Sequence, residues 1–181
     1  SVVEELERRI EEIAREIEEL NERHNRKNKE IADRIRDLNR RLNEANKKIV
    51  REIEEIKRRD GDDEDVRREI RELLERLKEL HRRVDRKVKE LLDELEKHLR
   101  EVDRRVEELL RRARKTLEDV RKDVDSRVLD KLRKELDDLR RRHEENVDRS
   151  RKHLEEVRKE HEENIKRSER HLEEVKKEAE R

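Results

Sequence analysis

The chain has 181 residues, with 55 Lys and Arg against 55 Asp and Glu, so its formal net charge is zero. Charged residues make up 61%, apolar residues only 28%, and Cys, Pro, Met, Phe, Tyr and Trp are all absent. This composition excludes cysteine chemistry, disfavours nucleic acid and acidic lipid as partners, and leaves no apolar run near the roughly 18 residues of a membrane span. We therefore expect a soluble protein, cytoplasmic when expressed recombinantly.

The first predicted helix covers residues 1–59. Low hydrophobicity usually indicates disorder, and a composition this rich in charge also fits a single solvated helix held by Glu–Lys and Glu–Arg pairs. A solvated helix needs no apolar stripe, but this segment has one, which includes Ile13, Ile31 and Ile49. The segment ends at the turn sequence 60–63, where Gly61 suits a helix C-terminus and the following aspartates suit an N-cap.

The second and third predicted helices cover residues 64–123 and 126–181. The junction between them has no Gly, although Asp125 or Ser126 can serve as an N-cap. The apolar stripe before Val124 keeps one direction, whereas the stripe that starts at Val128 points about 100° away from it. One continuous helix cannot bury both stripes against the same partner, so we expect the chain to turn here.

Short connections between three helices of similar length predict an all-α fold, an up-down-up bundle of long antiparallel helices. We expect a single domain over residues 1–181. The sequence also repeats every 18 residues, as in His143-Glu-Glu-Asn146 and His161-Glu-Glu-Asn164. Eighteen residues is five turns of 3.6 residues, so a stripe with this period stays straight and the helices should be nearly untwisted.

Polar residues interrupt the apolar stripes of all three helices. Buried polar groups cost roughly 1–3 kcal/mol each unless they are hydrogen-bonded, so we predict that they form shared networks that fix the pairing of the helices. The predicted network residues are His24, His81, His98, His143, His153, His161, His171, Asn21, Asn25, Asn28, Asn39, Asn43, Asn46, Asn146, Asn164, Ser150 and Ser168.

Antiparallel pairing across the predicted turns groups these residues into two layers. It places His24 opposite His98, and it places His81 near Ser168. One layer is expected to hold Asn21, His24, Asn25, Asn28, His98, Asn146, Ser150 and His153. The other is expected to hold Asn39, Asn43, Asn46, His81, Asn164, Ser168 and His171. We expect His143 and His161 beside the layers, each reaching the Asn three residues further on, and His153 and His171 partly exposed.

Metal binding and catalysis are both disfavoured by the spacing of these residues. Helical zinc sites use His-x-x-x-His or Glu-x-x-His spacing, and neither pattern occurs in this chain. Ser150 and His153 lie three residues apart, but no loop exists to build a cleft around them. Asp85 and Asp103 lie at the edge of their stripe and are assigned to surface ion pairs. We therefore predict no enzyme, no metal, no cofactor and no small-molecule substrate.

A pH response follows from buried histidine. The ordinary pKa of His is about 6.5, and burial in a network lowers it by desolvation. The folded state then binds fewer protons than the unfolded state, so stability falls as the pH drops below about 6.5. One unit of depression corresponds to about 1.4 kcal/mol per histidine.

The repeat, the Ile, Leu and Val layers and the Glu, Lys and Arg surfaces resemble those of de novo designed helical bundles with buried hydrogen-bond networks, most of all the pH-responsive type that pairs His with Asn. The resemblance implies no natural biochemical function, a switch role for the seven histidines, and self-assembly into an oligomer or filament. The alternative is a binding module that pairs with a partner helix along one face of the first helix, formed by Ala14, Asn25, Ala32, Asn43 and Val50.

Overall fold

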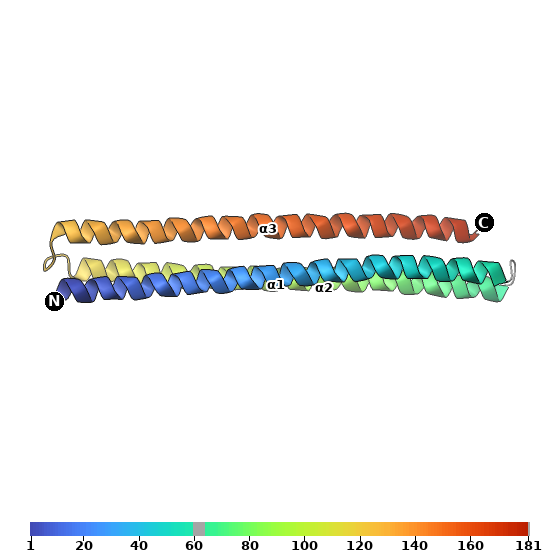
Figure 1. The fold of residues 1–181 in the computed structure, drawn as a ribbon, viewed down its shortest axis with the longest axis horizontal. Helices are drawn as coiled ribbons and strands as arrows, with labels where there is room; N and C mark the ends of the chain where they lie inside the picture. The colour runs from blue at the N-terminus through green and yellow to red at the C-terminus, as the bar shows by residue number, and fades with distance from the viewer. Residues whose placement is uncertain (60–63, 181) are drawn as a thin grey trace. The chain divides into compact units, whose positions relative to one another are not determined.

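The computed structural model describes residues 1–59 and 64–180. These residues form three helices, α1 (Val2–Arg59), α2 (Glu64–Asp119) and α3 (Ser126–Glu180) (Figure 1). The prediction of an all-α chain with three helices is confirmed. The predicted turn at 60–63, with Gly61 and its neighbouring caps, lies outside the described residues.

The connection between α2 and α3 begins earlier than predicted, because α2 ends at Asp119 and not at residue 123. Residues 120–123 form a turn in which the backbone N–H of Asp123 donates to the carbonyl of Val120 at 2.9 Å. Asp125 then caps α3, since its side-chain oxygen accepts a hydrogen bond from the backbone N–H of Arg127 at 3.2 Å. Val124, only 8% exposed, is buried between the turn and this cap.

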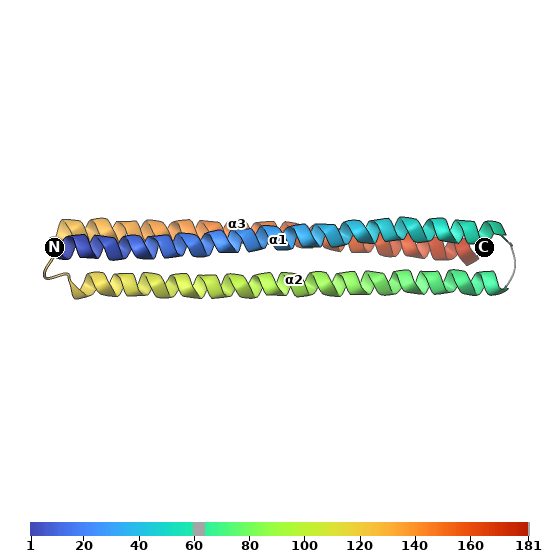
Figure 2. The ribbon, with the colours of Figure 1, turned by 60° about the horizontal axis from the view of Figure 1, so that its bottom comes forward.

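The chain divides into two compact units. Each unit includes a part of α1, α2 and α3, the helices labelled in Figures 1 and 2. Unit 1 consists of Ser1–Glu30 and Glu94–Leu154. Unit 2 consists of Ile31–Asp93 and Glu155–Arg181. The single domain over residues 1–181 and the straightness expected from the 18-residue repeat stay predictions.

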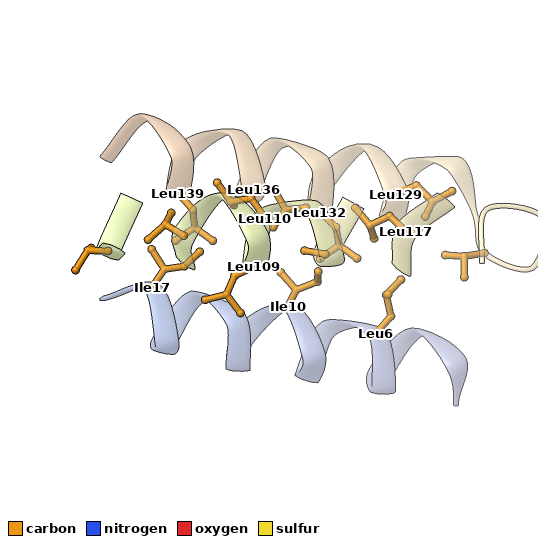
Figure 3. Packing of buried hydrophobic residues seen from close by; sticks show 14 residues of the cluster. Leu6, Ile10, Ile17, Leu109, Leu110, Leu117, Leu129, Leu132, Leu136 and Leu139 are labelled. Atoms are coloured by element: carbon orange, nitrogen blue, oxygen red, sulfur yellow. The ribbon is translucent and has the colours of Figure 1, made fainter. Parts of the chain in front are cut away.

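Unit 1 has a core of aliphatic side chains from the three helices (Figure 3). Burial of each such side chain contributes roughly 1.5–3 kcal/mol relative to leaving it in water. The labelled side chains in Figure 3 are Leu6, Ile10, Ile17, Leu109, Leu110, Leu117, Leu129, Leu132, Leu136 and Leu139.

Unit 2 has a smaller aliphatic cluster of Ile53, Ile56, Ile70, Leu74 and Val175, in which α3 supplies only the valine. The buried face of α3 is largely polar beyond Leu139. Between residues 140 and 180 its buried positions hold His143, Asn146, Val147, Ser150, Val157, His161, Asn164, Ser168 and Val175. Hydrogen bonding must therefore hold much of α3 in place, because few apolar side chains are available to do so.

Candidate functional site

Each unit contains several separate hydrogen-bonded groups of mostly buried histidine and asparagine side chains, and the groups of one unit are together called its network. Network 1, in unit 1, consists of Asn21, His24, Asn25, Asn28, His98, Asp103, His143, Asn146, Ser150 and His153. Network 2, in unit 2, consists of Asn39, Asn46, His81, Asp85, His161, Asn164 and Ser168. Both networks contain side chains from all three helices.

In network 1, the ring of His143 on α3 lies between α1 and α2. Its Nδ1 is 3.0 Å from Oδ1 of Asn21, and its Nε2 is 2.8 Å from a carboxylate oxygen of Asp103. The imidazole is only 1% exposed. Both ring nitrogens therefore face oxygen atoms, which is the arrangement that a doubly protonated imidazolium satisfies best.

The amide of Asn21 is oriented by two further hydrogen bonds. Its Nδ2 donates to the carbonyl of Ile17 at 3.2 Å, and its Oδ1 accepts from Nδ2 of Asn146 at 3.1 Å. The oxygen is therefore fixed toward His143, where it can only accept a hydrogen bond. Nδ2 of Asn25 completes the group by donating to Oδ1 of Asn146 at 3.0 Å.

Network 2 repeats this arrangement 18 residues further along α1 and α3. Nδ1 of His161 is 3.1 Å from Oδ1 of Asn39, and its Nε2 is 2.9 Å from a carboxylate oxygen of Asp85. Asn39 donates to the carbonyl of Ile35 at 3.1 Å and accepts from Asn164 at 2.8 Å. His161 thus also has an acceptor oxygen at each ring nitrogen.

The second feature of network 1 is a pair of imidazoles that joins α1 to α2. Nδ1 of His24 lies 3.2 Å from Nδ1 of His98. The ring centroids are 5.4 Å apart and the planes differ by 13°. Most of the centroid separation therefore runs along the line of the two Nδ1 atoms, so the rings meet edge to edge, with one Nδ1 donating and the other accepting. Nε2 of His24 is buried without a partner among the described residues.

In network 2, the contact between α1 and α2 is made by a single histidine. Nε2 of His81 is 2.8 Å from Oδ1 of Asn46, whose Nδ2 donates to Oγ of Ser168 at 3.0 Å. Because Asn46 presents its oxygen, Nε2 of His81 carries the proton and Nδ1 does not. That Nδ1 is buried and has no partner among the described residues.

Asn28 links α1 to α3 in network 1. Its Nδ2 donates to the carbonyl of Ser150 at 3.4 Å, and its Oδ1 lies 2.9 Å from Nδ1 of His153. His153 is half-buried, so the rest of its ring is within reach of water.

Burial lowers the pKa of three of these histidines. Desolvation, together with the nearby His98 and His143, lowers the pKa of His24 from 6.5 to about 4. Desolvation and the charge of Lys27 lower the pKa of His98, against the opposing effect of Glu101 and Glu94. Desolvation and the nearby His171 lower the pKa of His81. All three histidines belong to the contacts between α1 and α2.

The pKa of Asp85, the carboxylate bonded to His161, is also lowered. Partial burial favours its neutral form, but the hydrogen bonds from His161 and Lys89, and the charges of these two groups, outweigh that effect and lower the pKa of Asp85 below its ordinary 3.8. Nζ of Lys89 is 3.0 Å from the second oxygen of this carboxylate. The carboxylate therefore stays charged in mild acid.

When the two units are aligned by the 18-residue repeat, a histidine of one unit is replaced by leucine in the other at three positions. In unit 2, Leu42 and Leu80 stand where unit 1 has His24 and His98. In unit 1, Leu99 stands where unit 2 has His81. The groups centred on His143 and His161 are repeated, whereas the histidines that join α1 to α2 are particular to each unit.

Several placements differ from the predictions. Asn25 and Asn43 are exposed, and Asn43 has no hydrogen-bond partner in the described part of the chain. The predicted layers placed both on the buried face, but they lie at the margin of the stripe of α1, where a small rotation about the helix axis decides burial. His171 is half-buried, in line with the partial exposure expected of it, but among residues 1–59 and 64–180 it has no hydrogen bond to the predicted layer.

The predicted partners of His143 and His161 are also corrected. These rings lie inside the networks and bond to Asn21 and Asn39, not to the asparagines three residues further along α3. Their second nitrogens bond to Asp103 and Asp85, which the sequence assigned to surface ion pairs. The signal was present in the sequence, because the two aspartates share the 18-residue spacing of the histidines.

The face proposed for a partner helix is not a continuous exposed surface. Ala32 is buried, at 3% exposure, and Ala14 and Val50 are half-buried, so only Asn25 and Asn43 are exposed. Among residues 1–59 and 64–180, no three His, Asp or Glu side chains form a group able to hold a metal ion. No helix in this part of the chain combines the length and apolar character that crossing a bilayer requires.

Comparison with known proteins supports the fold. The chain is similar to a solved structure described as a computationally designed three helix bundle, with 21% identity and a TM-score of 0.59. The alignment covers 99% of this chain and 82% of that one. The chain is thus a three-helix bundle with buried His and Asn hydrogen bonds. No protein-family model and no curated protein matches it.

Proposed function

We propose that this chain is a non-catalytic structural bundle whose folded state is destabilised by acid. The observation that carries the proposal is that His24 and His81 each have a buried ring nitrogen without a hydrogen-bond partner among the described residues. In the protonated ring both nitrogens carry N–H groups, so this one is a donor on a charged ring with no acceptor. An unpaired buried charge is strongly destabilising, so these imidazoles favour the neutral form.

The direction of the pH dependence follows from linkage. The pKa of His24 is lower in the folded state, about 4, than its ordinary value of 6.5, so the unfolded state binds more protons between these values. Its contribution to stability is fully present above about pH 6.5 and is lost progressively as the pH falls toward about 4. The lowered pKa values of His81 and His98 act in the same direction.

The expected loss of stability in acid is a sizeable fraction of a typical folding free energy. For His24 alone, lowering the pKa from 6.5 to about 4 corresponds to about 3 kcal/mol. Typical domains are stable by only 5–15 kcal/mol. The loss is shared within the His24–His98 pair, because neighbouring titrating groups take up protons as a unit.

Urea unfolding followed by circular dichroism at a series of pH values tests the proposal. We expect the free energy of unfolding to fall by several kcal/mol between about pH 7 and about pH 4.5. The matched control replaces His24, His98 and His81 by Leu, the residue found at the equivalent positions of the other unit. A free energy that is as flat with pH in the native chain as in this control would overturn the proposal.

We also propose that the sequence is of designed type and has no natural substrate. The repeat, the absence of Pro and Cys, and the fold shared with a computationally designed three helix bundle support this origin. Within that proposal, the partner is a second copy of the same chain, because zero net charge favours association.

A further inference from the structure

The hydrogen-bonded histidines at the contacts among the three helices lie in two different kinds of surroundings. The contacts that lose stability on protonation, His24 with His98 and His81 with Asn46, all join α1 to α2. The contacts of α3 run through His143 and His161, whose ring nitrogens all face oxygen atoms. The first kind of histidine joins α1 to α2, and the second kind joins α3 to both of these helices.

A neutral imidazole cannot satisfy both neighbours of His143. It carries one N–H, whereas Asn21 and Asp103 each present an acceptor oxygen. The second proton turns the unmatched contact into a charge-assisted hydrogen bond. The same holds for His161 between Asn39 and Asp85.

Each of these two rings is hydrogen-bonded to an amide on α1 and to a carboxylate on α2. His143 faces the uncharged Asn21 and the titratable His24 on α1, and the carboxylate of Asp103 on α2. His161 faces the uncharged Asn39 on α1 and the carboxylate of Asp85 on α2. Lys89, on α2, forms an ion pair with the same Asp85 carboxylate, so part of the negative charge beside His161 is already balanced.

The rings between α1 and α2 have the opposite surroundings. His24 faces His98 on α2 and His143 on α3, so any added charge meets another imidazole. His98 faces Lys27 on α1, with Glu94 and Glu101 on its own helix.

The contact in unit 2 has no carboxylate among the groups that shift the pKa of its histidine. His81 faces the amide of Asn46 on α1 and the imidazole of His171 on α3. No carboxylate from residues 1–59 or 64–180 is bonded to the ring of His24, His81 or His98.

We infer that mild acid opens the contacts between α1 and α2 first, while the hydrogen bonds of His143 to Asn21 and Asp103, and those of His161 to Asn39 and Asp85, keep α3 bonded to both other helices to lower pH. This inference rests on the proposed acid sensitivity and divides it into two steps. The first step is the loss of the histidine contacts between α1 and α2, and the second is the loss of the contacts of α3 at lower pH.

Pairs of spin labels in unit 1 can follow the two steps separately, since the chain has no native cysteine. Arg26→Cys with Lys97→Cys reports on α1 and α2, and Arg26→Cys with Asp148→Cys reports on α1 and α3. All three positions are exposed. We expect the first distance distribution to broaden between about pH 6.5 and about pH 5, and the second to broaden only below that range.

The outcomes separate the two proposals. Simultaneous broadening of both distributions, or earlier broadening between α1 and α3, overturns the two-step inference and leaves the acid sensitivity standing. No broadening of either distribution down to about pH 4 overturns the proposed acid sensitivity and the inference with it.

A second test removes the carboxylates. Asp103→Asn with Asp85→Asn keeps an acceptor oxygen at each histidine but removes the charge that stabilises the imidazolium. We expect the acid midpoint between α1 and α3 to rise by roughly half a pH unit or more. Asp93→Asn is the matched control, because Asp93 is exposed on the same helix and has no ion pair among the described residues. A midpoint that moves no further than in this control overturns the inference.

Discussion

The effect of acid on a buried histidine depends on what its unprotonated nitrogen faces. At His143 both ring nitrogens have an oxygen within 3.0 Å, whereas His24 and His81 each have a buried ring nitrogen with no partner among the described residues. The sequence predicts that histidines lie on the buried stripes. It does not distinguish these two environments, because they depend on the angle of each ring and on the orientation of single amide groups.

Replacing His24 and His98 together by Leu tests the cost of their contact at neutral pH. Leu42 and Leu80 occupy the equivalent positions of unit 2. The replacement removes a buried nitrogen without a partner, and relief of such a group is worth roughly 1–3 kcal/mol. We expect the variant to be at least as stable as the native chain in urea unfolding at about pH 7.5. A loss of more than about 2 kcal/mol would contradict this assignment.

Replacing Asn39 by Ala tests the central amide of network 2. The substitution leaves Nδ1 of His161 and Nδ2 of Asn164 without their acceptor, so we expect a loss of roughly 1–3 kcal/mol. Asn43→Ala is the matched control on the same helix, because its amide is exposed, and it should change stability by no more than about 0.5 kcal/mol. Equal losses in the two variants, measured by urea unfolding, would show that the buried network contributes nothing.

At the scale of the element, the apolar stripes and the change of phase near Val124 predict the three helices correctly. The end of α2 is less well predicted, because the turn at 120–123 is held by backbone hydrogen bonds that leave no mark in the side-chain pattern. Periodicity also placed Asn25 and Asn43 on the buried face. It defines the centre of a stripe better than its margin, where both residues lie.

The start of α3 depends on one cap. Asp125 accepts from the backbone N–H of Arg127, and loss of an N-cap side chain typically costs about 1 kcal/mol. We expect Asp125→Ala to lower the melting temperature by roughly 2–5 °C, while Ser126→Ala leaves it nearly unchanged. The opposite ranking in thermal unfolding would assign the cap to Ser126.

At the scale of the whole molecule, the predicted self-association depends on which side chains the surface exposes. Only Val2 is exposed among the large apolar side chains in the described residues, so the apolar stripes are buried within the units. Association would then depend on the charged surface, whose formal net charge is zero.

Light scattering at about pH 7.5 and about pH 4.5 tests the predicted self-assembly. We expect a mass above the 22.6 kDa of one chain at the higher pH and a fall toward 22.6 kDa in acid. A constant 22.6 kDa at every concentration and at both pH values would exclude a second copy as the partner.

The most direct measurement of the central claim is an NMR titration of the imidazole nitrogens in the folded chain. The account predicts that His24 keeps the nitrogen shifts of a neutral ring until the pH approaches about 4. His81 and His98 should likewise take up a proton only below the ordinary value of about 6.5. Protonation of His24 and His81 near pH 6.5 in a chain whose helices stay folded would contradict the claim that their burial makes the folded state sensitive to acid.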